Sequence, residues 1–204
     1  MGNRVMKQKI VKEGYNKVAE DYSSQRDAFK NIPCLEKLSN LLPKGSKILD
    51  VGCGAGIPID KYLIERGYSV IGIDISEKQV ELARKNLPQA SYEVKDMSDL
   101  KIGEYQIDAI VSFYSIFHIP REGHYRLFQK FNSFLKPGGL ILVTMGSSEW
   151  EGEEENFHGA RMYWSHHGPE KNIEIVSKAG FDVLLNEIDT SGGEKHQIIL
   201  ARKT

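Results

Sequence analysis

A glycine-rich turn is the part of this sequence whose residue types and spacing most clearly indicate chemistry. It reads Asp50-Val51-Gly52-Cys53-Gly54-Ala55-Gly56 and directly follows a short apolar run. Glycines between a strand and a helix let the backbone turn tightly and approach a ligand, and the helix N-terminus behind them offers free N–H groups. The spacing is G-x-G-x-G and not the G-x-G-x-x-G of dinucleotide-binding turns. Such a turn can also be purely structural, so further residues must support a ligand site.

Two carboxylates follow at the ends of the next two predicted strands. Asp74 ends the second strand about 20 residues after the turn, the position from which a carboxylate reaches a ribose diol. Its alternative role is to cap the following helix, but Ser76 already suits that role. Asp96 ends the third strand and could accept a hydrogen bond from an adenine amine, with Met97 against the ring. Asp99 competes for that role, and Asp96 could also be an ordinary loop carboxylate.

Apolar strands and amphipathic helices alternate around these residues, and this pattern places them at one sheet edge. Strands are predicted at 46–51, 69–74, 92–95, 107–113 and 140–145. Helices are predicted between them, from 57 to 66, after Ser76, and up to the Lys136-Pro137-Gly138-Gly139 stop. Strict alternation of this kind predicts a parallel sheet built from right-handed βαβ units.

The C-terminal part departs from this alternation. A helix is predicted over 169–179, followed by strands over 181–188 and 197–201 that only a short Gly-rich turn separates. Two strands joined so closely must be antiparallel. An α/β sheet that finishes with an antiparallel hairpin differs from the usual dehydrogenase sheet.

Together these segments resemble the class I S-adenosylmethionine-dependent methyltransferases, especially the small-molecule enzymes. The resemblance covers roughly residues 15–202 and rests on 48–56, 72–76, Asp96-Met97 and 134–139. It implies an α/β fold with a Rossmann-like, doubly wound, seven-stranded, mostly parallel sheet and an antiparallel C-terminal hairpin strand. It also implies one domain over 1–204 and S-adenosylmethionine as cofactor. The cofactor contacts expected from it are the glycine turn for methionine, Asp74 for ribose and Asp96 with Met97 for adenine. The full expected set is Tyr22, Arg26, Asp50, Gly52, Cys53, Gly54, Gly56, Asp74, Ile75, Asp96, Met97 and Ser112.

The N-terminal segment, residues 1–44, is expected to form a helical lid over this cofactor. Tyr15, Val18, Ala19 and Tyr22 fall on one face of an amphipathic helix. In similar enzymes this region covers the cofactor, so the resemblance makes Tyr22 and Arg26 candidates for contacts around the methionine carboxylate. Packing on the sheet is the alternative role, and it suits Tyr15 as well as a lid role does.

Methyl transfer is an in-line displacement that depends mainly on proximity and orientation, so it demands no single residue type. The loop after the fourth strand should lie beside the methyl group, and Tyr114 and His118 are its catalytic candidates. His118 could act as a general base or as a wall of the pocket. The segment 146–168 is rich in aromatic and polar residues for a connecting loop, and we expect it to cover the substrate.

Composition limits the classes of partner that we expect the protein to bind. The 204 residues carry 27 basic and 28 acidic side chains for a formal charge of −1, which argues against a large nucleic-acid footprint. No apolar stretch is long enough for a membrane span, and no secretory signal is visible at the N-terminus. The two cysteines show no metal-ligand spacing, so we expect no metal site and a reducing, cytoplasmic setting.

The sequence therefore predicts a methyltransferase that uses S-adenosylmethionine and acts on a small-molecule acceptor, with no nucleic-acid or membrane partner. Two alternatives remain open. One is a catalytically silent S-adenosylmethionine-binding module that regulates a partner. The other is a nicotinamide-dependent oxidoreductase, which the glycine spacing and the C-terminal hairpin disfavour. The sequence does not indicate the acceptor atom or the oligomeric state.

Overall fold

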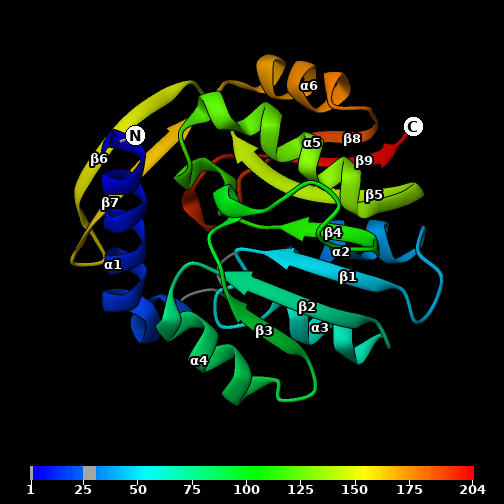
Figure 1. The fold of residues 1–204 in the computed structure, drawn as a ribbon, viewed down its shortest axis with the longest axis horizontal. Helices are drawn as coiled ribbons and strands as arrows, with labels where there is room; N and C mark the ends of the chain where they lie inside the picture. The colour runs from blue at the N-terminus through cyan, green and yellow to red at the C-terminus, as the bar shows by residue number, and fades with distance from the viewer. Residues whose placement is uncertain (1, 25–30) are drawn as a thin grey trace.

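A seven-stranded sheet with helices on both faces forms the body of the protein (Figure 1). The computed structural model describes residues 2–24 and 31–204. The strand order is β3-β2-β1-β4-β5-β9-β8, and every neighbouring pair from β3 to β5 is parallel. The first five strands are β1 (Lys47–Val51), β2 (Ser69–Asp74), β3 (Ser91–Val94), β4 (Ile107–Ser112) and β5 (Leu135–Gly146). This architecture confirms the predicted fold class.

The strands are apolar along their length because both faces of the sheet are covered. In β1, Ile48 and Leu49 are both fully buried but belong to cores on opposite sides of the sheet. The Leu49 side is filled by helices α5 (His124–Phe134) and α6 (Pro169–Lys178). The Ile48 side is filled by α2 (Ile32–Ser39) and α3 (Ile59–Glu65). Burial of β1 on both faces holds its carboxyl end, and the glycine turn after it, in a fixed place.

The predicted C-terminal hairpin is present. Strands β8 (Phe181–Asp189) and β9 (His196–Lys203) are antiparallel and are joined through the short helix η5 (Ser191–Gly193). Strand β9 inserts between β5 and β8 and runs against both, so it is the reversed strand of the sheet.

The segment between Gly146 and Gly168 is a regular β-hairpin, which corrects the expectation of a connecting loop. Strands β6 (Trp150–Phe157) and β7 (Ala160–His166) form a separate two-stranded sheet. Its apolar side chains Met162 and Tyr163 are buried against Val11 of helix α1 (Gly2–Ser24). The hairpin and α1 stand together beside the carboxyl ends of the parallel strands (Figure 1). The sequence concealed the hairpin because one of its strands is a run of exposed acidic residues without an apolar alternation.

Shorter elements complete the carboxyl edge of the sheet. Helix α4 (Glu77–Asn86) follows β2, and the short helices η2 (Met97–Asp99), η3 (Ile116–His118) and η4 (Arg121–Gly123) follow β3 and β4. In the part of the chain that the structure describes, no helix combines the length and apolarity needed to cross a bilayer.

Helix α4 begins at Ser76, and this residue provides a test of how the fold is held. The Ser76 hydroxyl accepts a hydrogen bond from Gln79 N at 3.1 Å and donates one to Asn16 Oδ1 at 2.6 Å, which ties α4 to α1. We expect Ser76→Ala to lower the free energy of unfolding by about 1–2 kcal/mol, because the cap and the interhelical bond are both lost. Urea unfolding measures the change. Ser177→Ala on the exposed face of α6 is the control and should change it by less than about 0.5 kcal/mol; equal effects of the two variants would contradict this account.

Candidate functional site

A cavity of about 900 Å³, including its open mouth, lies at the carboxyl edge of the parallel strands. Open α/β sheets bind ligands at this edge, in the crevice outside the carboxyl ends of the strands. Its wall contains most residues that the sequence singled out: Tyr22, Asp50, Gly52, Cys53, Gly54, Asp74, Ile75, Asp96, Met97, Tyr114 and His118.

The glycine turn forms the floor of the cavity, and its first glycine has no room for a side chain. Gly52 has φ +80°, and a Cβ on it would lie 2.3 Å from the Ser115 Cβ. Its N–H, like that of Cys53, donates to the Ile73 carbonyl, at 2.8 and 3.1 Å, which draws the turn against β2. Gly54 also has a positive φ of +54°. Such a bare backbone cradle fits a ligand that must approach the main chain closely.

Asp74 is held at the cavity wall by backbone donors from two segments. Its Oδ2 accepts from Gly54 N at 3.0 Å, and its Oδ1 accepts from Ser76 N at 2.9 Å. Burial raises the pKa of this carboxyl to about 6, although both backbone hydrogen bonds act to lower it. Each carboxylate oxygen has a second lone pair for a further donor, so the group can accept from a ribose diol. Ser76, and not Asp74, accepts the capping hydrogen bond of α4.

Asp50 and Asp60 lie close together beneath the glycine turn, and the sequence did not predict this pairing. Asp60 on α3 is fully buried and lies close to Asp50 and to the Tyr92 hydroxyl. Burial raises the pKa of Asp60 to about 6, because a charged carboxylate there would be poorly solvated. Asp60 therefore takes up a proton more readily than an exposed carboxylate does. No spacing in the sequence relates Asp50 to Asp60 across a strand and a helix, so only the folded chain reveals it.

The part of the cavity beside the end of β3 distinguishes Asp96 from Asp99, the two carboxylates that the sequence left as alternatives. Asp96 lines the cavity with Met97 and accepts from Ser98 N at 2.7 Å, which caps the short helix η2. Asp99 points outward and pairs with Arg4 at 2.7 Å. Asp96 is therefore the carboxylate that a ligand in this cavity would meet.

Helix α1 closes the cavity from the side opposite the sheet. Tyr22, Tyr15, Val11 and Gln8 all line it. Val11 and Gln8 precede Tyr15 by four and seven residues, so the helical period would have placed them on the same face, but the sequence analysis did not predict them. The other helix of the predicted lid, α2, packs beneath the sheet instead. Arg26 lies outside the residues that the structure describes.

His118 is a buried member of a hydrogen-bonded chain. Its Nδ1 lies 2.8 Å from the carbonyl oxygen of Tyr163, and its Nε2 lies 2.7 Å from the Tyr15 hydroxyl. A carbonyl can only accept, so Nδ1 carries the proton and Nε2 accepts from Tyr15. Burial lowers the pKa of His118 to about 4, so the ring is neutral near pH 7 and keeps this arrangement. The cavity therefore contains a Tyr15–His118 pair with a defined direction of hydrogen bonding.

The remaining predicted residues occupy supporting positions. Tyr114 lines the cavity in a left-handed conformation, φ +56°, but its hydroxyl donates to Asn31 Oδ1 at 2.7 Å. Its phenol is therefore engaged within the protein. Ser112 is buried outside the cavity wall, and its hydroxyl bonds to the Val51 carbonyl at 2.7 Å. Gly56 also lies outside the wall, where a Cβ would come within 2.9 Å of the Tyr92 hydroxyl.

The raised pKa of Asp74 predicts how binding of a ribose-containing ligand responds to pH. Only the carboxylate form accepts from both hydroxyls, so affinity for S-adenosylhomocysteine should fall as pH drops through about 6. We expect the Kd to rise about tenfold between about pH 7 and about pH 5 in calorimetric titrations. Asp99→Asn should keep this profile and Asp74→Asn should lose it. A profile that survives in Asp74→Asn would assign the titration to the Asp50–Asp60 pair instead.

This chain resembles known methyltransferases in sequence. Residues 48–139, which include the glycine turn, Asp74 and His118, match the model of a methyltransferase domain. The chain is 32% identical to a mouse (Mus musculus) tRNA (carboxymethyluridine(34)-5-O)-methyltransferase over 72% of its own length and 21% of that protein. It is also 32% identical to phosphoethanolamine N-methyltransferase 1 of Zea mays over 85% of its own length and 35% of that protein.

Solved structures that resemble it cover 81% to 97% of this chain. Magnesium protoporphyrin IX methyltransferase of Synechocystis, with bound S-adenosylhomocysteine, matches at a TM-score of 0.73 and 18% identity, covering 97% of this chain and 100% of that one. At such low identity this match shows the fold alone. The first curated relatives are longer, and the chain spans 21% to 60% of their lengths.

Proposed function

Since the chain belongs to the class I S-adenosylmethionine-dependent methyltransferases, we propose that it transfers the methyl group of this cofactor to a small-molecule acceptor. The observation that carries the proposal is the cavity itself. It combines a bare glycine turn and a fixed carboxylate at one end with the Tyr15–His118 pair at the other.

The cofactor end of the proposal follows from the donors and acceptors in the wall. Asp74 would accept from the ribose hydroxyls, and Asp96 from the adenine amine, with Met97 against the ring. The turn at Gly52 and Gly54 would hold the methionine part, because both glycines line the cavity and their bare backbone allows a close approach. When bound, the cofactor supplies an electrophilic methyl group on a sulfonium sulfur.

The acceptor end depends on Tyr15 and His118. Tyr15 donates its proton to His118 Nε2, and a phenol oxygen in that arrangement can accept a hydrogen bond from an O–H or N–H of the acceptor. This contact would aim the nucleophilic atom and exclude water, which are the main contributions a protein makes to such a displacement. With its pKa lowered to about 4, His118 serves as an orienting acceptor and is a poor proton store.

A small acceptor is favoured over a nucleic acid by two features. The cavity is bounded by the sheet on one side and by α1 on the other, so cofactor and acceptor must share a limited space. The formal charge of −1 provides no basic excess for a polynucleotide backbone. The relatives include both a tRNA methyltransferase and a phosphoethanolamine methyltransferase, so the acceptor class must be tested directly.

Calorimetric titration tests the cofactor assignment. We expect S-adenosylmethionine and S-adenosylhomocysteine to bind and NADH not to bind. Asp74→Ala should weaken binding of both sulfur compounds at least about tenfold, because two charge-assisted hydrogen bonds are lost. Asp99→Ala, which removes a carboxylate outside the cavity, should bind like the wild type. Binding of NADH alone would restore the oxidoreductase alternative and refute the proposal.

Transfer of a labelled methyl group tests the activity. Small amines, phenols and hydroxy compounds are offered as acceptors beside bulk tRNA. Label in a small acceptor, reduced in Tyr15→Phe, supports the proposal. Label in tRNA alone would refute the small-molecule assignment, and tight cofactor binding without transfer to any acceptor would favour the silent regulatory module.

A further inference from the structure

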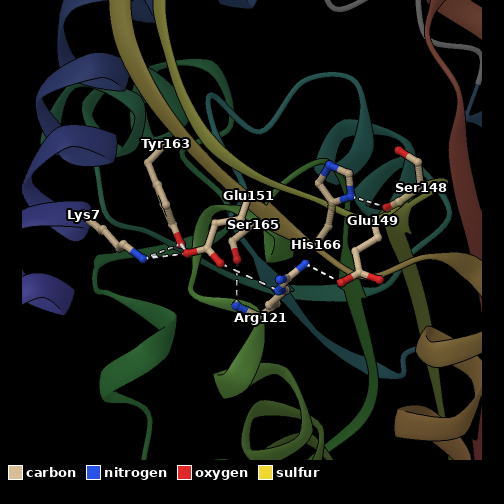
Figure 2. Close-up of polar contacts among 8 residues, drawn as sticks. All are labelled: Lys7, Arg121, Ser148, Glu149, Glu151, Tyr163, Ser165 and His166. Atoms are coloured by element: carbon tan, nitrogen blue, oxygen red, sulfur yellow. Dashed lines mark hydrogen bonds and ion pairs between the residues drawn. The ribbon is translucent and has the colours of Figure 1, made fainter.

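The polar groups around Tyr163 join helix α1 to the β6–β7 hairpin (Figure 2). Lys7 Nζ donates to the Tyr163 hydroxyl at 2.9 Å and pairs with Glu151 at 2.7 Å. The Tyr163 hydroxyl in turn donates to the same Glu151 oxygen at 2.7 Å. The Lys7 ammonium also lies over the Tyr163 ring, 4.5 Å from its centroid. Three residues from three elements therefore fix one another at an almost fully buried tyrosine.

The backbone of the same tyrosine reaches the candidate site. The Tyr163 carbonyl accepts from His118 Nδ1–H, and His118 Nε2 accepts from the Tyr15 hydroxyl. Tyr15 lies on α1 about two helical turns beyond Lys7. The contacts therefore close a ring that runs from Lys7 through Tyr163 and His118 to Tyr15 and back along α1.

Glu151 also connects this closed chain of contacts to the segment that carries His118. Arg121 Nε lies 3.7 Å from Glu151 Oε2, and Arg121 N donates to the Ser165 hydroxyl at 2.9 Å (Figure 2). Arg121 begins η4, directly after the η3 segment that ends at His118. The hairpin is thus tied on one side to α1 and on the other to the chain next to His118.

We propose that Tyr163, with Lys7 and Glu151, is a positioning group for methyl transfer that sets the tautomer of His118. This inference rests on the function proposed above, in which the Tyr15–His118 pair meets the acceptor. A neutral imidazole can exchange its proton between its two nitrogens, and the partner of one nitrogen decides which is protonated. With the Tyr163 carbonyl in place, Nδ1 holds the proton and the Tyr15 hydroxyl must donate to Nε2.

Loss of the polar ring would change the direction of hydrogen bonding at the acceptor. If β7 shifts and the carbonyl leaves Nδ1, the proton can move to Nε2, which then donates to the Tyr15 oxygen. The Tyr15 hydroxyl would then point its proton toward the methyl-accepting molecule. A methyl acceptor whose own O–H or N–H must donate to Tyr15 would lose that hydrogen bond. The apolar contacts of Met162 and Val11 keep the hairpin on α1 in either case. The polar contacts therefore set the orientation of the hairpin on α1, and the apolar contacts hold it there.

The test compares Tyr163→Phe and Glu151→Gln with a control on the same hairpin. Tyr163→Phe keeps the aromatic ring and the backbone carbonyl of residue 163 but removes the hydroxyl. Glu151→Gln is isosteric and changes a partly exposed side chain. The control is Arg161→Met, which removes an ion pair with Glu153 and Glu155 that does not include Tyr163. Thermal unfolding followed by circular dichroism verifies that each variant folds, and Glu151→Gln carries the test if Tyr163→Phe does not fold.

The first readout is independent of activity. In the full chain with ¹⁵N-labelled histidine and bound S-adenosylhomocysteine, wild type and Arg161→Met should show His118 with Nδ1 protonated and Nε2 unprotonated. Tyr163→Phe and Glu151→Gln should show His118 nitrogen resonances averaged between the two tautomers. Unchanged His118 resonances in both would overturn the proposal, whether or not the protein transfers methyl groups.

The second readout uses the acceptor that the labelled-methyl screen identifies. Tyr163→Phe and Glu151→Gln should lower kcat about tenfold while the KM for S-adenosylmethionine changes little, since the cofactor contacts are untouched. Normal kcat in both variants would overturn the positioning role and leave the proposed function standing. A tautomer change in a protein that methylates no acceptor would support the positioning of His118 and refute the methyltransferase activity.

Discussion

The hydrogen bonds that Asp74 accepts from Gly54 N and Ser76 N are the interaction on which the site depends. They join the end of β2 to the glycine turn after β1 and to the start of α4. Ser76 continues the connection to Asn16 on α1. One carboxylate thus organises the floor of the cavity, one wall and, indirectly, its cover. Its pKa is raised because the carboxylate is held out of water, and its side chain lines the cavity.

The cavity has two ends built by different principles. The end that we assign to the cofactor belongs to the parallel sheet and is formed by strand ends and turns that the fold must place together. The end that we assign to the acceptor is assembled from α1, η3 and the added hairpin, and hydrogen bonds through His118 hold these elements together. The match to the methyltransferase-domain model covers residues 48–139, which include the sheet edge with the glycine turn and exclude α1 and the hairpin.

Most of the fold was predictable from the sequence because burial on both faces of the sheet gives continuous apolar strands such as β2, and because the turn at 190–194 is too short for a crossover. Asp74 and Asp96 were found by their places at strand ends. Tyr15 could be assigned to a helix face but not to a partner, since His118 lies 103 residues away. The β6–β7 hairpin was missed because Glu153, Glu154 and Glu155 carry no strand signal, and the pairing of Glu153 and Glu154 with β7 is visible only in the folded chain.

The most direct test of this account is a crystal structure of the full chain with S-adenosylhomocysteine. The account predicts the ligand in the cavity at the carboxyl edge of the sheet. Its ribose hydroxyls should lie within hydrogen-bonding distance of Asp74, its adenine beside Asp96 and Met97, and its sulfur on the side facing Tyr15 and His118. A ligand bound elsewhere, or in this cavity with its ribose away from Asp74, would contradict the account.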